Sequence, residues 1–367
     1  MTDSKSHHVR KRLFTNLYSK SNLQTSKEIS EISKELLLNR IMPIFQAAAT
    51  DDTSIEILEF GAAIGMDFTC AFLFGLGGGS DFIRDAQYRK HWLDAYEETK
   101  KYVTWVGELI IPVIILKVVG INIIPLSVFQ TLGDMEAWNL KMCTAVQDAQ
   151  SSGKAVGSTQ PLVYNQMVQG LEKVDQKSLD HPKDMMIASE MLDQILAGHE
   201  TTAITLAYLI YELSRHPETQ QKLREEVRTL SPRLDYPGTA ELPHPRAIDG
   251  LPLLDAVLQE TLRRYPPAAG SEPRVTPAAG AQIGPYHVPG GVRISCNQYS
   301  LHRNADVFPE PEAWKPERWL QATKEKKTEM MKWFWAFGSG PRMCLGVYFA
   351  TQGHKFQSYI CAVTNNH

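Results

Sequence analysis

Apolar positions recur at helical spacing through the first two-thirds of the chain. A pattern of about 30 residues in the middle predicts one helix about 48 Å long at 1.5 Å per residue. Pro217 is placed to open the helix that follows it, and Pro266 and Pro267 end a later one. Helices are predicted over residues 29–49, 55–76, 182–213, 218–230 and 251–265.

The pattern changes after residue 282. Residues 283–299 indicate short strands around a Pro289-Gly290-Gly291 turn, and residues 324–332 are predicted to be a charged loop. A glycine-rich loop at 337–346 then precedes a helix that runs to about Ala362. The predicted fold class is therefore mainly α with a small β region.

The most apolar stretch of the chain is residues 102–128. Glu108, Pro112, Lys117 and Pro125 interrupt it, so it lacks the run of about 20 apolar residues that a bilayer span requires. Buried helices or a loop that dips into a membrane surface are the two interpretations favoured here.

Charge and cysteine content exclude some classes of protein. The 38 basic and 41 acidic side chains argue against a nucleic-acid-binding protein, which usually has a strong basic excess. Five scattered cysteines favour reduced thiols over a disulfide framework. The first residues are basic without an apolar segment behind them, so they do not form a secretory signal.

Cys344 is the residue that carries most chemical information. Glycines at 338, 340 and 346 free its loop from ordinary backbone limits, and a helix is predicted to follow. The unpaired N–H groups at a helix start, together with the charge of Arg342, would stabilise a thiolate.

This loop resembles the heme-binding loop of the cytochrome P450 superfamily, with fungal microsomal members most similar. Phe337, Gly340, Arg342, Cys344 and Gly346 match the fixed positions of that loop. The resemblance implies that Cys344 is the axial ligand of the iron of heme b and that Arg342 contacts a heme propionate. Gly346 would let the porphyrin approach the backbone.

A second resemblance concerns charged residues in the segments before and after the predicted strands. Glu260 and Arg263 share a helix face at i,i+3 and can pair. Pro316 to Trp319 resembles the family segment that supplies a second arginine, here Arg318. In the family these three residues form a buried network that supports the cysteine loop, so the role implied here is structural.

A third resemblance lies in the middle of the long helix. Ala197, Gly198, Glu200 and Thr201 match the family segment over the distal face of the heme. A carboxylate and a hydroxyl can relay protons to bound dioxygen, so Glu200 and Thr201 are the implied catalytic residues. The alternative interpretation is a threonine that bonds back to a helix carbonyl beside a solvated glutamate.

Weaker matches complete the implied cofactor pocket. Arg274 lies where the family supplies a propionate-binding arginine. His7 and Lys11 align with a tryptophan and an arginine of the family's third helix, so this propionate contact is altered here.

Taken together, the resemblance implies a single domain over residues 1–367, shaped as a helical prism. It implies a monooxygenase that uses O2 and electrons from NADPH through a reductase. The implied substrate is an apolar organic molecule of secondary metabolism or a xenobiotic. The implied location is the cytosolic face of the endoplasmic reticulum membrane, reached by the full-length family member, with membrane contact through 102–128. The domain is expected to be incomplete, without the family's anchor and first strands and without its last strands.

Three alternatives to an active monooxygenase remain. One is a truncated, inactive heme-binding fragment. Another is a heme-binding sensor without turnover, which NADPH and a reductase would not drive to oxidise any substrate. The third is a heme-thiolate isomerase or dehydratase, which would not need Glu200 and Thr201.

Overall fold

The computed structural model describes residues 4–102, 105, 109–118, 120–153, 157–174, 181–232 and 241–364. The chain is mainly helical with a small antiparallel β region, as the sequence predicts. It divides into two compact units. Unit 1 comprises Met1–Lys11, Tyr18–Gln24 and Ile204–His367, and unit 2 comprises Arg12–Leu17 and Thr25–Ala203. The single domain inferred from the sequence stays a prediction.

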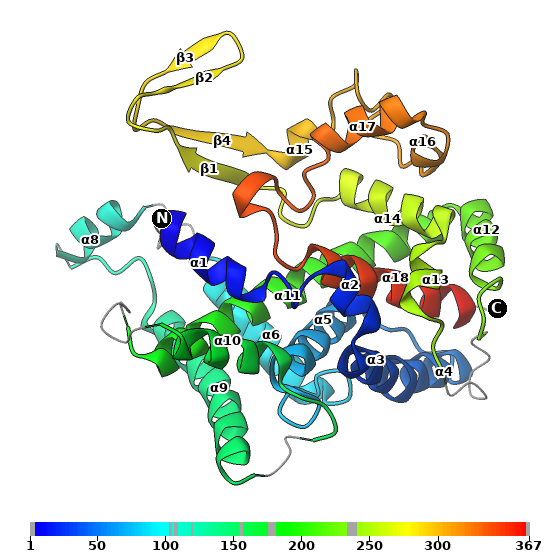
Figure 1. Ribbon diagram of the computed structural model, residues 1–367, viewed down its shortest axis with the longest axis horizontal. Coiled ribbons are helices and arrows are strands. Elements are labelled where there is room, and N and C mark those ends of the chain that lie inside the picture. The colour runs from blue at the N-terminus through cyan, green and yellow to red at the C-terminus, as the bar shows by residue number, and fades with distance from the viewer. Residues whose placement is uncertain are drawn as a thin grey trace. The chain divides into compact units, whose positions relative to one another are not determined.

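Unit 2 is built from helices, coloured dark blue to green in Figure 1. The helix predicted over 29–49 is found as three consecutive helical segments, the middle one a π-helix. The elements are α3 Lys27–Lys34, η1 Glu35–Ile41, α4 Met42–Thr50, α5 Ile57–Phe74, α6 Ala86–Lys100, α8 Ile110–Val118, α9 Leu126–Ser151 and α10 Leu162–Glu172.

Helix α5 forms the core of this unit. Nearly all of its side chains from Phe60 onward are buried, and Gly75 ends it at a φ of 77°. The buried carboxylate of Asp67 accepts hydrogen bonds from the Ser80 hydroxyl at 2.6 Å and the Phe82 amide at 2.8 Å, which fixes the chain beyond the helix. Within the described residues α5 is also the one helix long and apolar enough to cross a membrane, and 83% of its apolar window is buried in the protein.

Helix α8 lies in the apolar stretch 102–128, and its described side chains are mostly exposed. Ile111 is 68% exposed and Val118 82% exposed, so the interpretation as a buried helix is wrong for this segment. Seven of its nine residues, Ile110–Val118, are aliphatic, and several of these are exposed. Residues 103, 104, 106–108 and 119 lie outside the described part of the chain.

Helix α11, Lys183–Arg215, is the long helix predicted over 182–213, and it contributes residues to both units. The helices predicted at 218–230 and 251–265 are confirmed as α12 and α14. Unit 1 contains α1 Ser4–Phe14, α2 Lys20–Thr25, α12 Pro217–Val227, α13 Pro245–Asp249, α14 Pro252–Arg264, α15 Gln298–Leu301, α16 Glu317–Leu320, α17 Lys324–Trp333, the 3-10 turn η3 Gly340–Arg342 and α18 Val347–Thr364; α1 and α2 each run past the unit boundary.

The strands form two antiparallel pairs, which Figure 1 shows in yellow, with β2 and β3 projecting beyond β1 and β4. Strand β1 Ser271–Val275 pairs with β4 Arg293–Asn297, and β2 Ala281–Ile283 pairs with β3 Tyr286–Val288. The predicted turn is present, with Gly291 at a φ of 78°. It connects β3 to β4, which do not pair with each other: β3 pairs with β2, and β4 pairs with β1. The sequence analysis did not recognise β1 and β2.

The charged segment 324–332, predicted as a loop, is helix α17. The Thr323 hydroxyl caps it by accepting the Lys326 amide at 3.2 Å, and Lys326 pairs with Glu329 at i,i+3. A capping threonine and such pairs favour a helix even where most side chains are charged. The loop prediction was wrong because it rested on the charge of the segment and left the capping threonine out.

Candidate functional site

The loop from Phe337 to Gly346 closes on itself through backbone hydrogen bonds. Gly338 and Gly340 have φ values of 70° and 69°, which a residue with a side chain rarely adopts. The Cys344 amide donates to the Phe337 carbonyl at 2.8 Å, and the Met343 amide donates to the Gly340 carbonyl at 3.0 Å. The two glycines therefore let the chain double back and hold Cys344 just before α18.

Cys344 presents its side chain at the surface of the described chain. Desolvation raises the pKa of its thiol, while the Gly346 amide and the positive charge of Lys11 act in the opposite direction. Among the described residues, the Cys344 Sγ at 3.8 Å is the one atom beyond the chain neighbours that a Cβ built on Gly346 would meet within 4 Å, so the backbone at Gly346 is open. Cys344 is therefore an exposed residue beside open space at the Gly346 backbone.

Lys11, on α1, is fastened to this loop. Its Nζ donates to the Pro341 carbonyl at 3.0 Å and to the Met343 carbonyl at 2.6 Å, on either side of Arg342. His7 lies one turn earlier on the same helix. The structure thus brings Lys11, Arg342 and Cys344 together.

Glu260, Arg263 and Arg318 form the network that the sequence predicts. Both oxygens of Glu260 accept from Arg263, at 2.8 and 2.9 Å, and the Arg318 Nε donates to Glu260 at 3.0 Å. Glu260 and Arg263 are fully buried. A buried charge is costly unless it is paired and hydrogen-bonded, and here the pairing satisfies that requirement.

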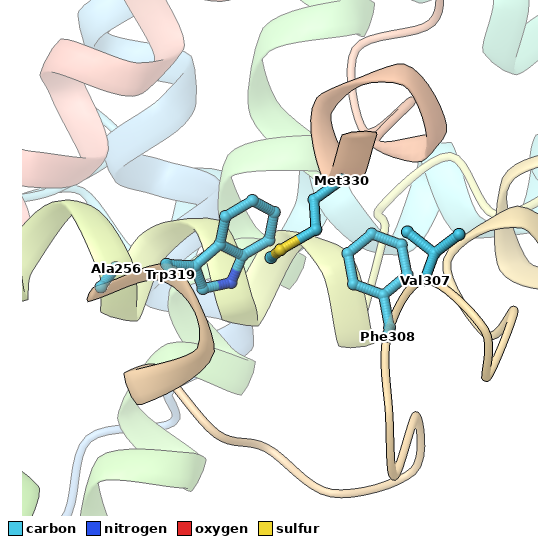
Figure 2. Packing of buried hydrophobic residues seen from close by; sticks show 5 residues of the cluster. All are labelled: Ala256, Val307, Phe308, Trp319 and Met330. Atoms are coloured by element: carbon cyan, nitrogen blue, oxygen red, sulfur yellow. The ribbon is translucent and has the colours of Figure 1, made fainter. Parts of the chain in front are cut away.

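Two further residues of this network were not recognised from the sequence. The indole nitrogen of Trp319 donates to Glu260 at 2.9 Å, and His302 contacts the backbone of Arg263. Trp319 belongs to a buried cluster shown in Figure 2, where the Met330 side chain reaches from α17 toward it. The signal in the sequence that could have identified Trp319 as part of the network is its position directly after Arg318.

Arg274 lies on β1 and pairs with Glu272. Its Nη2 is 3.3 Å from the Glu272 carboxylate, and its side chain is 43% exposed. Glu272 also accepts from the Gln298 amide at 2.5 Å, and a Cβ built on Gly338 would come within 3.0 Å of it. Arg274 is therefore held beside the turn that begins the cysteine loop.

Gly198 lies where α11 crosses α5. A Cβ built on Gly198 would be 2.2 Å from the Thr69 Oγ1, and one built on Gly65 would be 2.7 Å from the Gly198 carbonyl oxygen. No real Cβ tolerates such distances, so the absence of a side chain is what allows the two helices to approach. Ala197, next to Gly198, is exposed.

Thr201 donates its hydroxyl to the Ala197 carbonyl at 2.8 Å, as a mid-helix threonine commonly does. Glu200 is not simply solvated: it accepts from the Tyr96 hydroxyl at 3.0 Å and binds the Lys100 ammonium, both on α6. Desolvation acts to raise the Glu200 pKa, but the hydrogen bonds and charge of these partners outweigh it and lower the pKa. Glu200 is held as a paired carboxylate.

Comparison with known proteins decides the family. Residues 2–356 match the family model described as Cytochrome P450. The chain belongs to the cytochrome P450 family. This confirms the resemblance read from the loop at Cys344, from the network at Glu260 and from the segment at Ala197.

Individual cytochrome P450 relatives are similar over different shares of the chain. The cytochrome P450 monooxygenase avaI of Aspergillus versicolor is 27% identical over 376 aligned positions, covering 98% of this chain and 82% of that protein. The cytochrome P450 monooxygenase orf2 of Aspergillus niger is 43% identical over 152 residues, covering 41% of this chain and 28% of that protein. The lithocholate 6-beta-hydroxylase of Mesocricetus auratus is 33% identical over 205 residues, 53% of this chain and 38% of that protein.

The cytochrome P450 family implies a heme cofactor, and the residues of this chain fit one. The thiol of the exposed residue Cys344 is the donor that heme-thiolate chemistry needs, and the backbone at Gly346 beside it is open. Lys11 and Arg342 supply positive charge at the same loop, which suits carboxylate groups on a ligand.

Proposed function

We propose that this cytochrome P450 is a heme-thiolate monooxygenase that inserts one oxygen atom of O2 into an apolar organic substrate. The observation that carries the proposal is the loop that holds the exposed residue Cys344 in place through the hydrogen bond from its amide to the Phe337 carbonyl. The names of the Aspergillus relatives, both monooxygenases, support the same reaction class.

In this proposal the Cys344 thiolate would bind the iron of heme b, and Phe337 and Gly346 would lie beside the heme. Arg342, Lys11, His7 and Arg274 are the candidates to hold the propionates. When bound, thiolate-ligated heme supplies the activation of O2, driven by electrons from NADPH through a reductase.

The proton-handling residues in the proposal are Thr201 and Glu200. The Thr201 hydroxyl proton now points to the Ala197 carbonyl and must turn away to donate elsewhere. The Glu200 carboxylate is in contact with two proton donors, the Tyr96 hydroxyl and the Lys100 ammonium. Lys100 is 38% exposed, and its ammonium holds Glu200 as an ionised carboxylate that can accept a proton.

Replacement of Thr201 tests this role. Thr201→Ala should lower product formed per NADPH by about tenfold or more, because positioned proton transfer contributes at least that much. NADPH consumption should continue, with hydrogen peroxide released, and Thr201→Ser should restore most of the coupling. Unchanged coupling in Thr201→Ala would remove the hydroxyl from the mechanism.

The reaction class itself is tested by turnover with isotopically heavy O2, NADPH and a diflavin reductase. One heavy oxygen atom per product molecule is expected. Product without labelled oxygen would favour an isomerase or dehydratase, and a heme-loaded chain that reduces O2 without any substrate oxidation would favour an inactive fragment.

The substrate class we infer is an apolar organic molecule. The exposed face of α8 supports contact with a membrane surface, where apolar substrates accumulate. The cytosolic face of the endoplasmic reticulum is the location that we propose.

Co-sedimentation with phospholipid vesicles should fall in an Ile111→Ser/Ile115→Ser variant and stay unchanged in Tyr286→Ser, which alters a similarly exposed side chain on β3. Equal binding by both variants would contradict the assignment to α8.

A further inference from the structure

His302 lies between two parts of unit 1, the buried network around Glu260 and the chain that leads into the cysteine loop. It is fully buried, directly after α15, and its ring stacks on Phe334 with centroids 5.4 Å apart. One side of the ring faces Arg263 of the buried network. The other faces Trp335, at the start of the chain that leads into the cysteine loop.

The hydrogen bonds of this ring specify its protonation state. His302 Nδ1 is 3.0 Å from the Arg263 carbonyl oxygen, which can only accept, so Nδ1 must carry the proton. The Trp335 amide donates to His302 Nε2 at 2.8 Å, so Nε2 must offer a lone pair. Only the neutral ring protonated at Nδ1 satisfies both contacts.

The contact to Arg263 is reciprocal. The Arg263 Nη1 donates to the His302 carbonyl at 3.0 Å, while its other guanidinium nitrogens bind Glu260. His302 is thus fixed at both its backbone and its ring by the same buried arginine. This leaves the ring little freedom to turn away from Trp335.

From Trp335 the hydrogen bonds continue toward the cysteine. The Trp335 carbonyl accepts from the Gly338 amide at 2.8 Å, and the Phe337 carbonyl accepts from the Cys344 amide at 2.8 Å. An unpaired amide at Trp335 would cost free energy and loosen the first of these turns.

We propose that His302 is a positioning residue for the cysteine loop: as the Nδ1-protonated neutral ring, it ties the Trp335 amide to the backbone of Arg263. This rests on the proposed function only in taking Cys344 as the heme ligand. The residue acts through Trp335 and does not itself contact Cys344.

Two conservative variants separate the two ring contacts. In His302→Asn the side-chain amide can reach the position of Nδ1 and keep the bond to Arg263, but it is too short to accept from Trp335. In His302→Gln the amide oxygen can reach the position of Nε2 and keep the bond to Trp335. His302→Phe keeps the ring alone.

Hydrogen–deuterium exchange of the peptide covering residues 335–344 reads the loop directly, with or without heme. Exchange should be faster by on the order of tenfold in His302→Asn and unchanged within about twofold in His302→Gln. The peptide covering α12 is the internal reference. In the heme-loaded, reduced and CO-bound chain, His302→Gln should keep the spectrum of thiolate ligation, and His302→Asn should lose part of it.

The outcomes distinguish this proposal from the proposed function. If Asn and Gln variants exchange alike, whether both slowly or both rapidly, the specific tie to Trp335 is overturned. If the unaltered chain shows no thiolate spectrum, the proposed function fails, while the exchange measurement still decides the role of His302. A His302→Phe chain that does not fold leaves the Asn and Gln comparison intact.

Discussion

At the scale of single residues, Glu260 is the side chain on which most of the supporting structure converges. It accepts from Arg263, Arg318, Trp319 and the backbone amide of Lys315. The donors saturate both carboxylate oxygens in a site without solvent exposure. Removing one partner of a buried ion pair strongly destabilises the fold, because the remaining charge stays buried without a partner.

Neutralising this carboxylate should therefore be costly. Glu260→Gln should lower the free energy of unfolding by about 3–5 kcal/mol. Glu312→Gln is the matched control, since Glu312 also pairs with two arginines, Arg264 and Arg303, but is 61% exposed. Its effect should stay below about 1 kcal/mol. Chemical denaturation measures both, and equal effects would show that burial of Glu260 is not what matters.

The sequence indicated the pairing of Glu260 with Arg263 because i,i+3 neighbours on a helix face each other. It could not identify Trp319 and His302 as members of the same network, because their contacts with Glu260 and Arg263 form only when segments distant in the sequence come together. The same holds for Tyr96 and Lys100 around Glu200, which come from a helix about a hundred positions earlier in the chain.

At the scale of elements, the crossing of α5 and α11 depends on glycines. The distances around Gly65 and Gly198 leave no room for a methyl group between the helices. The family resemblance places Gly198 in the segment over the distal face of the heme. The structure shows that close packing against Thr69 already requires glycine at this position.

Adding a methyl group tests whether close packing requires glycine at Gly198, with Gly133 as a control in open space. Gly198→Ala should destabilise the fold by about 1–3 kcal/mol, because it overpacks the crossing. Gly133→Ala, in the middle of α9, meets nothing within 4 Å and should stabilise by about 0.5–1 kcal/mol through loss of backbone freedom in the unfolded chain. Thermal unfolding of both variants gives the comparison. Stabilisation by Gly198→Ala would contradict the packing account.

Helices were predicted well because their periodicity is local. Strand pairing was not, since β1 and β4 are separated by the whole β2–β3 hairpin. The error at α17 had another origin: the capping residue Thr323 was present in the sequence, but the prediction rested on the charge of the segment.

At the scale of the whole molecule, buried histidines make the fold sensitive to acid. Burial lowers the pKa of His302 and of His354 to about 4, and it also lowers the pKa of His199. Both ring nitrogens of His354 lack a hydrogen-bond partner among the described residues. These side chains are neutral in the folded protein at pH values where they are charged in the unfolded chain.

Stability should therefore fall as the pH is lowered from about 6.5 to about 4. The unfolded chain binds protons over this window while the folded chain does not, and each of the two histidines can contribute about 3 kcal/mol. His354→Leu should reduce the slope of unfolding free energy against pH, and His287→Leu, on an exposed hairpin, should leave it unchanged. A slope that is equal in all three chains would refute this account.

The most direct test of the central claim is the spectrum of the heme-loaded chain, reduced and bound to CO. The account predicts the red-shifted Soret band of thiolate ligation in the unaltered chain and in Cys296→Ala, which removes a cysteine on β4 outside the loop. It predicts loss of that band in Cys344→Ala. A thiolate band that persists in Cys344→Ala, or that disappears in Cys296→Ala, would contradict the assignment of Cys344 as the ligand.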